Sequence, residues 1–260
     1  MTLHTTPSSG RPASARNQRG MGIVELMVAL LIGLIMAVAL AWFYLGSRTL
    51  SRTSEDVSRL QESGRGALEI IGMAVRQAGY RSNVNSVLVC AGDITLPTDA
   101  SWKNCPLNGR DGTTGTAAAP DSLTVRFAAQ DGGSELDCTG AAISTGAMVT
   151  YAFTVDNSTN PPGLQCNGQR VVDNVEDMQI AYGIDADHDG QIELYKTQPT
   201  ASEFLTVAAV RVALLIRGPS TMIAANKTQT IAFNGNSPTY TDGYLRQTYT
   251  GTFSVRPLAY

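Results

Sequence analysis

Three aspartates at alternate positions, followed by a glycine, form a group of side chains that suits a cation. They lie in the segment DADHDGQIE, residues 185–193. Carboxylate and carbonyl oxygens are the ligands that calcium prefers, and a D-x-D-x-D-G order turns the backbone sharply so that several of them converge. We therefore expect calcium to bind four carboxylates and, at Gln191, a backbone carbonyl; the five residues are Asp185, Asp187, Asp189, Gln191 and Glu193.

The acidic segment is not a complete calcium loop. Calcium takes about six to eight oxygens, and Lys196 holds the place where such a loop usually ends in a bidentate glutamate. The flanking segments QIAYGI and QIELY have the pattern of strands rather than helices. A plain hairpin with an Asp-Gly turn and solvated acids is the alternative. Because carboxylates so close together repel one another unless a cation screens them, the sequence favours weak calcium binding, and it points to no other cofactor.

A single acid interrupts an apolar run near the N-terminus. From Ile23 to Leu45 every residue is apolar or glycine except Glu25. As a helix this run is about 35 Å long, enough to cross a hydrocarbon core of about 30 Å. In the simpler interpretation Glu25 only reaches the lipid headgroups. A chain cut between Gly20 and Met21, however, has a new amine four residues before Glu25. The amine of a neighbouring copy then gives the carboxylate the partner that an acid in lipid requires.

The flanks of the apolar run indicate how it is oriented. Three arginines, and no acid, lie in the first 20 residues. Basic residues before a span hold the N-terminus in the cytoplasm, and the aromatic group Trp42-Phe43-Tyr44 suits the far interface. The run is longer than the apolar core of a secretory signal peptide. We expect a single-pass inner-membrane protein whose C-terminal domain is periplasmic.

All four cysteines follow the apolar run, and no two of them form a C-x-x-C pair. Zinc and thioredoxin-like sites are therefore disfavoured, and an even number in an exported domain indicates two disulfides. Three pairings are open from sequence alone. Proximity in the chain favours Cys90 with Cys105 and Cys138 with Cys166, the alternative being four reduced, buried thiols.

Charge and motif content exclude several functions. Without the first 20 residues the chain has 16 basic against 22 acidic residues, so we expect no nucleic-acid partner. The only histidines are His4 and His188, and the chain has no G-x-S-x-G, H-E-x-x-H or phosphate-cradling motif. We expect no catalytic residue and no enzymatic activity.

The elements that position these groups are a long helix and a β-rich domain. Apolar residues recur at helical spacing from Leu50 to Ala78, and acids and arginines, Asp56 among them, occupy the face expected to be exposed to solvent. No proline occurs between Met21 and Tyr80. Gly79 is the expected stop. Further on, short β-rich runs alternate with turn residues, while residues 91–120 and 130–146 have the composition of loops. The fold class is α+β: a long N-terminal helix, half transmembrane and half amphipathic, packed on an antiparallel β-sheet domain. The expected runs are SLTVRFAA, GAMVTYAFTV, QRVV, MQIAYGI, QIELY, LTVAAVRVALLIRG, QTIAF and QTYTGTFSVRP.

The N-terminal residues RGMGIVELMVALLIGL resemble the class III signal of type IV prepilins. The resemblance implies that a prepilin peptidase cuts after Gly20 and that Met21 is then N-methylated. Met21 in place of the phenylalanine usual in major subunits, and the long leader, are features of minor pilins. The segments VVDNVEDMQIAYGIDADHDGQIELY and VAAVRVALLIRG are similar to the PilW-type minor pilins.

The resemblance implies a domain order, a set of partners and a location. The expected segments are 1–20, a cleaved leader; 21–46, the transmembrane and assembly helix; 47–80, its amphipathic continuation; and 81–260, a β-rich extracytoplasmic domain. The expected partners are prepilin peptidase, other minor and major pilins, inner-membrane lipid and the pilus assembly machinery. The expected function is that of a minor pilin in a type IV pilus assembly or priming complex, found in the pilus or at its tip. The alternatives are a minor pseudopilin of a type II secretion system and a membrane-tethered ligand-binding ectodomain that never polymerises.

Overall fold

The structure is a computed structural model that describes residues 22–80, 105–112, 119–129, 136–144, 147–221, 228–235 and 237–255. The chain divides into two units, Met1–Leu50 and Ser51–Tyr260. Gly20 and Met21, the residues of the expected cleavage site, lie outside the described residues.

In the first unit, the described part is the beginning of helix α1, which runs from Ile23 to Gln77. Every described side chain from Ile23 to Leu50 is exposed, and the large apolar ones have exposed fractions from 49% to 79%. The most apolar window of this helix has a mean hydropathy of 2.8 and no buried residue. By length and composition, α1 is therefore able to cross a membrane.

In the second unit, α1 buries one face in the core. The predicted stripe is confirmed at Leu60, Ala67, Ile71, Val75 and Ala78, which are all at most 1% exposed. The helix ends as expected, with Gly79 in a left-handed conformation (φ 73°). Two predictions about single residues are wrong. Asp56, expected on the solvent-exposed face, is only 4% exposed. Leu50, the last residue of the first unit, was expected in the apolar stripe and is 73% exposed.

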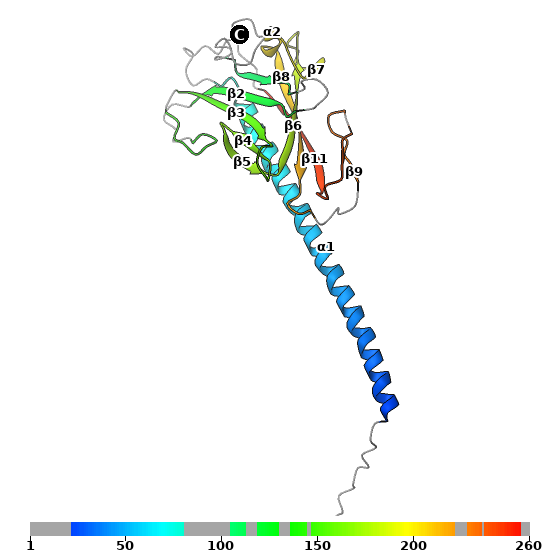
Figure 1. Cartoon of the computed structure of the whole chain (residues 1–260). Helices are drawn as coiled ribbons and strands as arrows, with labels where there is room; N and C mark the ends of the chain where they lie inside the picture. The colour runs from blue at the N-terminus through cyan, green and yellow to red at the C-terminus, as the bar shows by residue number, and fades with distance from the viewer. Residues whose placement is uncertain are drawn as a thin grey trace, which may run out of the picture. The chain divides into compact units, whose positions relative to one another are not determined.

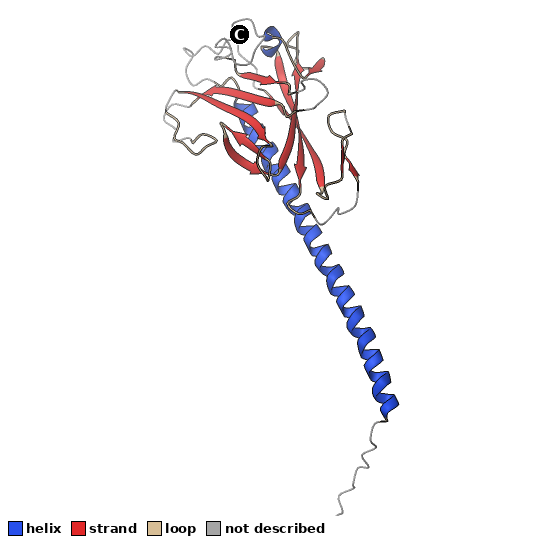
Figure 2. Ribbon diagram, in the orientation of Figure 1, coloured by secondary structure: helices blue, strands red, loops and turns tan. Residues whose placement is uncertain are grey.

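The strands form two larger antiparallel sheets and a small ribbon (Figure 1; Figure 2). The first sheet has the order β1 (Leu107–Arg110), β2 (Ser122–Ala128), β3 (Met148–Asp156), β4 (Gly163–Cys166), β5 (Gln169–Asp173). The second has the order β11 (Arg246–Ser254), β8 (Val207–Arg217), β6 (Val175–Ile184), β7 (Leu194–Lys196). The ribbon pairs β9 (Gln229–Thr230) with β10 (Thr239–Tyr240), and a short helix α2 (Ala201–Phe204) precedes β8.

One hydrophobic core joins the second half of α1 to both larger sheets. Strand β8 shows the predicted alternation, because Val210, Val212, Leu214 and Ile216 are fully buried while Arg211 is exposed. The helix approaches β11 closely at two glycines. A Cβ atom on Gly64 would lie 2.5 Å from the Tyr249 ring, and one on Gly72 would collide with the Phe253 ring.

The α+β class, with its long helix and antiparallel sheets, is confirmed. Some expected loops are not loops: β1 lies within 91–120, and Leu136 bridges Ala142 within 130–146. Strands β4 and β10 and helix α2 were also not predicted.

Candidate functional site

Glu25 lies in the first turn of α1, where its backbone N–H donates to the Gly22 carbonyl at 3.0 Å. Its side chain is exposed, as are those of all its described neighbours in the first unit. An acid in a first helical turn is favoured by the helix dipole, which helps the helix begin here. Among the described residues the carboxylate has no side-chain partner, so a cation supplied by another chain is free to reach it.

The acidic turn connects β6 to β7 and brings its carboxylates together. Oxygen atoms of four acidic side chains lie within 4.8 Å of one another; the four are Asp185, Asp187, Asp189 and Glu193. Asp185 is buried and the other three are exposed. The turn depends on two left-handed residues, His188 (φ 61°) and Gly190 (φ 87°). This grouping suits a divalent cation, although exposed acidic groups are common without one.

Backbone amides occupy part of the acidic turn. Asp185 accepts hydrogen bonds from the amides of Asp189 (3.2 Å) and Gly190 (3.0 Å), and Glu193 accepts one from Ala186 (3.0 Å). Gln191, expected to offer a carbonyl, donates to Asp189 from both its backbone and its side chain. These bonds hold the carboxylates in place without a metal, which leaves calcium binding as a prediction.

Lys196, at the position where a calcium loop usually ends in glutamate, binds another group. Its Nζ lies 2.5 Å from Oε1 of Glu203, on helix α2. The hydrogen bond from Lys196, together with those from Thr200, lowers the pKa of Glu203 to about 2. The lysine therefore supports the connection after β7 rather than the acidic turn.

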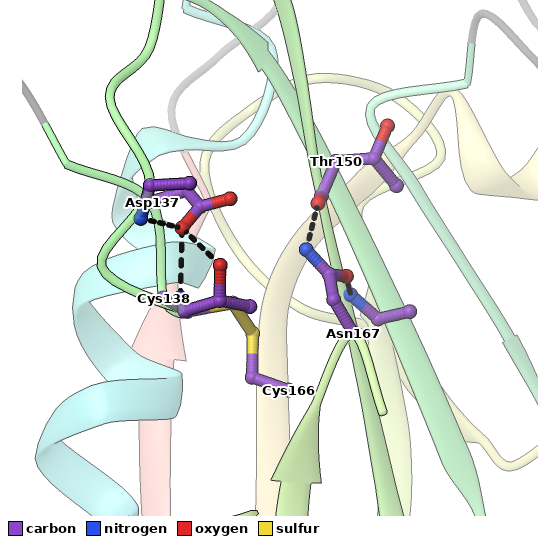
Figure 3. The surroundings of a disulfide bond; sticks show 8 residues. Asp137, Cys138, Thr150, Cys166 and Asn167 are labelled. Carbon is purple, nitrogen blue, oxygen red and sulfur yellow. Dashed lines mark hydrogen bonds between the residues drawn. A yellow bond between two sulfur atoms is a disulfide. The ribbon is translucent and has the colours of Figure 1, made fainter. Parts of the chain in front are cut away.

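A disulfide joins Cys138 to Cys166, with 6.1 Å between their Cα atoms, and this is the pairing that proximity in the chain favoured. Figure 3 shows its surroundings. Asp137 accepts hydrogen bonds from Thr139, and Asn167 binds the backbone of Thr150 and Ala152 on β3. The disulfide thus links the segment around Asp137 to the end of β4.

The other expected disulfide is only partly described. Cys105 is fully buried and takes part in a disulfide. Cys90 lies outside the described residues, so its pairing with Cys105 stays a prediction.

A buried arginine, which the sequence analysis missed, links β11 to β6. Arg246 forms two hydrogen bonds with Glu176 (2.6 and 2.9 Å) and two with Asp242 (2.7 and 2.6 Å). Burial alone would lower the pKa of Arg246, but these bonds raise it above its ordinary value. The guanidinium also stacks on Tyr240, 3.9 Å from the ring centroid. An arginine just before a predicted strand gives no signal of burial, because its partner Glu176 is 70 residues away.

A buried aspartate, also missed, connects the two larger sheets. Asp121 is 3% exposed and accepts hydrogen bonds from the amides of Gly112 (2.8 Å) and Ile180 (2.7 Å). Burial raises the pKa of Asp121 to about 6, although the two amide bonds oppose the rise. Both buried groups connect strands of the β-rich domain, and neither touches Glu25 or the acidic turn.

Two family models match the chain. The type IV pilus-assembly protein W family (PilW) matches residues 144–257, which include the acidic turn and strands β3 to β11. The prokaryotic N-terminal methylation motif matches residues 15–41, which include Gly20, Met21 and Glu25. Pilins are structural proteins rather than enzymes.

The other comparisons add a structural likeness. A search of curated proteins gave no match. Among solved structures the chain is similar to a type IV-like pilin from Thermus thermophilus, with 16% identity and a TM-score of 0.43 over 78% of this chain and 98% of that chain. The resemblance to PilW-type pilins is thus confirmed by the two family models: the chain has an N-terminal methylation motif and a region that matches the PilW family.

Proposed function

We propose that the chain is a minor pilin that joins a type IV pilus assembly or priming complex and supports pilus biogenesis. In this proposal prepilin peptidase cuts after Gly20, Met21 is N-methylated, and the protein waits in the inner membrane with its β-rich domain in the periplasm. The observation that carries the proposal is the pairing of a methylation motif over residues 15–41 with an apolar helix whose side chains are all exposed from Ile23 to Leu45. An uncovered apolar surface of this length calls for lipid, and then for the helices of other subunits.

Glu25 acts as the assembly contact in this proposal. The new amine at Met21 of one subunit approaches the Glu25 carboxylate of its neighbour inside the helical stack. An ammonium and a carboxylate that are both removed from water attract strongly, whereas either one alone is costly there. The pair therefore favours the addition of processed subunits over unprocessed ones, whose amine lies at the end of the leader.

The proposed partners are prepilin peptidase, the other minor and major pilins and the membrane-embedded assembly machinery. Two alternatives remain, a minor pseudopilin of a type II secretion system and a tethered ectodomain that never polymerises. The N-terminal motif does not separate the first alternative from a pilus subunit. The presence of the chain in sheared pili, rather than in a secretion pseudopilus, would distinguish a pilus subunit from a minor pseudopilin.

The mass of the intact protein extracted from membranes tests the proposal. Loss of residues 1–20 together with the gain of one methyl group is the expected result. A matched strain that lacks the prepilin peptidase should yield the full-length, unmethylated chain. An intact leader in the presence of the peptidase would contradict the proposal and favour the tethered ectodomain.

A further inference from the structure

Strand β11 has an unpaired outer edge. It is the end strand of its sheet and pairs on one side with β8, from Arg246 opposite Arg217 to Ser254 opposite Ala209. It has nine residues. Among the described strands, the other end strands of the two larger sheets are much shorter, with three, four and five residues in β7, β1 and β5. The outer side of β11 is therefore the longest free edge in the described part of the fold.

The hydrogen bonds at both ends of β11 show which backbone groups point outward. The Leu245 carbonyl accepts from Gly218 of the β8 side (2.7 Å), and the Val255 amide donates to Ala208 (2.8 Å). Because alternate residues of an antiparallel strand face the partner, the odd-numbered residues of β11 bond to β8. The even-numbered residues direct their N–H and C=O groups away from the sheet, and no described residue bonds to the last four of them: Thr248, Thr250, Thr252 and Ser254.

The first even-numbered residue shows what this edge accepts. The Arg246 amide donates to Oε1 of Gln229 (3.1 Å), and Nε2 of Gln229 donates to the Arg246 carbonyl (3.0 Å). A side-chain amide thus makes the pair of bonds that a neighbouring strand would make. The same donor and acceptor pattern continues along the edge without a partner.

The edge also lacks the usual protection against strand addition. Natural proteins block exposed edges with lysine, proline, a bulge or a very short strand. From Gln247 to Ser254 the strand QTYTGTFS has no charged residue and no proline, and its pairing with β8 has no bulge. The side chains of Thr250, Thr252 and Ser254 are exposed.

A groove of about 670 Å³ lies alongside this edge, between α1 and β11. On the helix it is lined by residues at helical spacing, among them Arg65, Leu68 and Arg76, and on the strand by Tyr249 and Phe253. Leu68, Tyr249 and Phe253 are half-buried, while both arginines are exposed. Apolar side chains therefore form its floor, and the two arginines against a single acid, Glu69, make it basic.

We propose that the edge of β11 accepts an extended strand from another pilin subunit, which adds a fifth strand to the four-stranded sheet. The backbone of the incoming strand bonds to Thr248, Thr250 and Thr252. Its groove-facing side chains are apolar above Leu68, Tyr249 and Phe253, with an acidic residue opposite Arg65 or Arg76. This inference rests on the proposed function, since it names the surface through which the minor pilin meets a neighbour in the same complex.

Amide hydrogen exchange of the full-length chain tests the proposal, with the chain in detergent alone and in purified pili or the pilin complex. The outward amides of Thr248, Thr250 and Thr252 should exchange fast in the isolated chain and on the order of 100-fold more slowly in the assembly. The inward amides of Tyr249 and Gly251, bonded to β8, are the internal control and should be slow in both. If the chain is in the assembly and the outward amides stay fast, the inference is wrong and the proposed function stands. If the chain is absent from every pilin assembly, both are wrong.

A proline substitution removes one outward donor without touching β8. Thr250→Pro deletes an N–H that has no described partner, and proline is tolerated at edge positions whose N–H faces solvent. It should lower incorporation into pili by about tenfold, from the loss of a backbone bond and the bulk of the ring. Thr250→Ala, which keeps the N–H, should be incorporated like the wild type. The membrane level and leader cleavage of both variants should be unchanged, and equal incorporation of the two would contradict the proposal.

Discussion

At the scale of single residues, Glu25 stands out because it is the only charged side chain between the start of α1 and Arg48. Glu25→Gln keeps the shape and the exposed position but removes the negative charge. If the carboxylate pairs with a neighbour's amine in the assembled helices, the variant leaves that amine buried without a counter-ion, at a cost of about 3–5 kcal/mol. We expect its amount in sheared pili to fall at least about tenfold, with an unchanged membrane level, as measured by quantitative immunoblotting.

The matched control for this prediction is Glu55→Gln on the same helix. Glu55 is 62% exposed and forms only a surface pair with Arg59, so its loss should have little effect. Wild-type incorporation of Glu25→Gln would show that the acid has no part in assembly.

The acidic turn gives a second prediction at this scale. Millimolar calcium should raise the melting temperature of the purified full-length chain, because the cation offsets the repulsion among the four carboxylates of the turn. Asp187→Ala should abolish the rise, since Asp187 is exposed and its carboxylate is one of the four. Glu62→Ala, an exposed acid on α1, should keep the rise. An unchanged melting temperature of the wild type would reject the site.

Asp121 makes the stability of the fold depend on pH. Its folded pKa of about 6 lies above the ordinary value of 3.8, so the folded state binds the proton more tightly than the unfolded state. Its contribution is fully present below about pH 4 and is lost as the pH rises through about 6. We expect the wild type to gain about 1–2 kcal/mol relative to Asp121→Asn between pH 7 and pH 4.5, measured by chemical unfolding. A difference that does not vary with pH would contradict this assignment.

At the scale of elements, the glycines of α1 divide by face. Gly64 lies under the Tyr249 ring, whereas an added Cβ on Gly66 meets no atom within 4 Å. Gly66→Ala should stabilise the chain by up to about 1 kcal/mol, because alanine is the better helix former. Gly64→Ala should destabilise it by about 1–2 kcal/mol, because the contact with Tyr249 outweighs the same gain. Thermal unfolding of the two variants side by side measures the difference, and equal shifts would show that the helix does not press on β11.

The predictable elements are those whose signal is local. The helical spacing of apolar residues such as Leu60, Ala67 and Ile71, which are all buried, predicts α1. The alternation of apolar and polar residues around Arg211 predicts β8. Strand β4 was missed although a local signal existed: the Asn167-Gly168 pair, both residues left-handed (φ 51° and 79°), is a typical two-residue hairpin turn.

The remaining features depend on partners distant in sequence. Asp56 is buried because the segment after β8 covers it, where Ser220 donates to its Oδ1 over 164 residues of chain (3.2 Å). Arg246 and Glu176, and likewise Asp121 and Ile180, are hydrogen-bonded although they lie far apart in the sequence. The acidic turn was visible because its acids are adjacent in the chain, whereas the edge of β11 shows only when its pairing with β8 is known. The composition of β11 gives no sign of its edge position, because the strand has neither the lysine nor the proline that often marks an edge.

At the scale of the whole molecule, one covalent link constrains the β-rich domain. The Cys138–Cys166 disulfide closes a loop with a sequence separation of 28 residues. By the loop-closure relation, a cross-link of this span lowers the entropy of the unfolded chain enough to contribute about 3–4 kcal/mol. The link joins the segment around Asp137, which has few other ties, to the hairpin of β4 and β5.

Replacing both cysteines therefore tests how far the stability of the β-rich domain depends on this disulfide. Cys138→Ala/Cys166→Ala should lower the free energy of unfolding by about 3–4 kcal/mol and leave the pairing of β8 with β11 intact, because the four-stranded sheet lies outside the closed loop. Reduction of the wild type also breaks the disulfide of Cys105, so it should lower the free energy of unfolding at least as much as the double substitution. Chemical unfolding monitored by circular dichroism measures the free energies of unfolding of the double variant and of the reduced wild type. A double variant as stable as the oxidised wild type would show that packing alone holds the segment around Asp137.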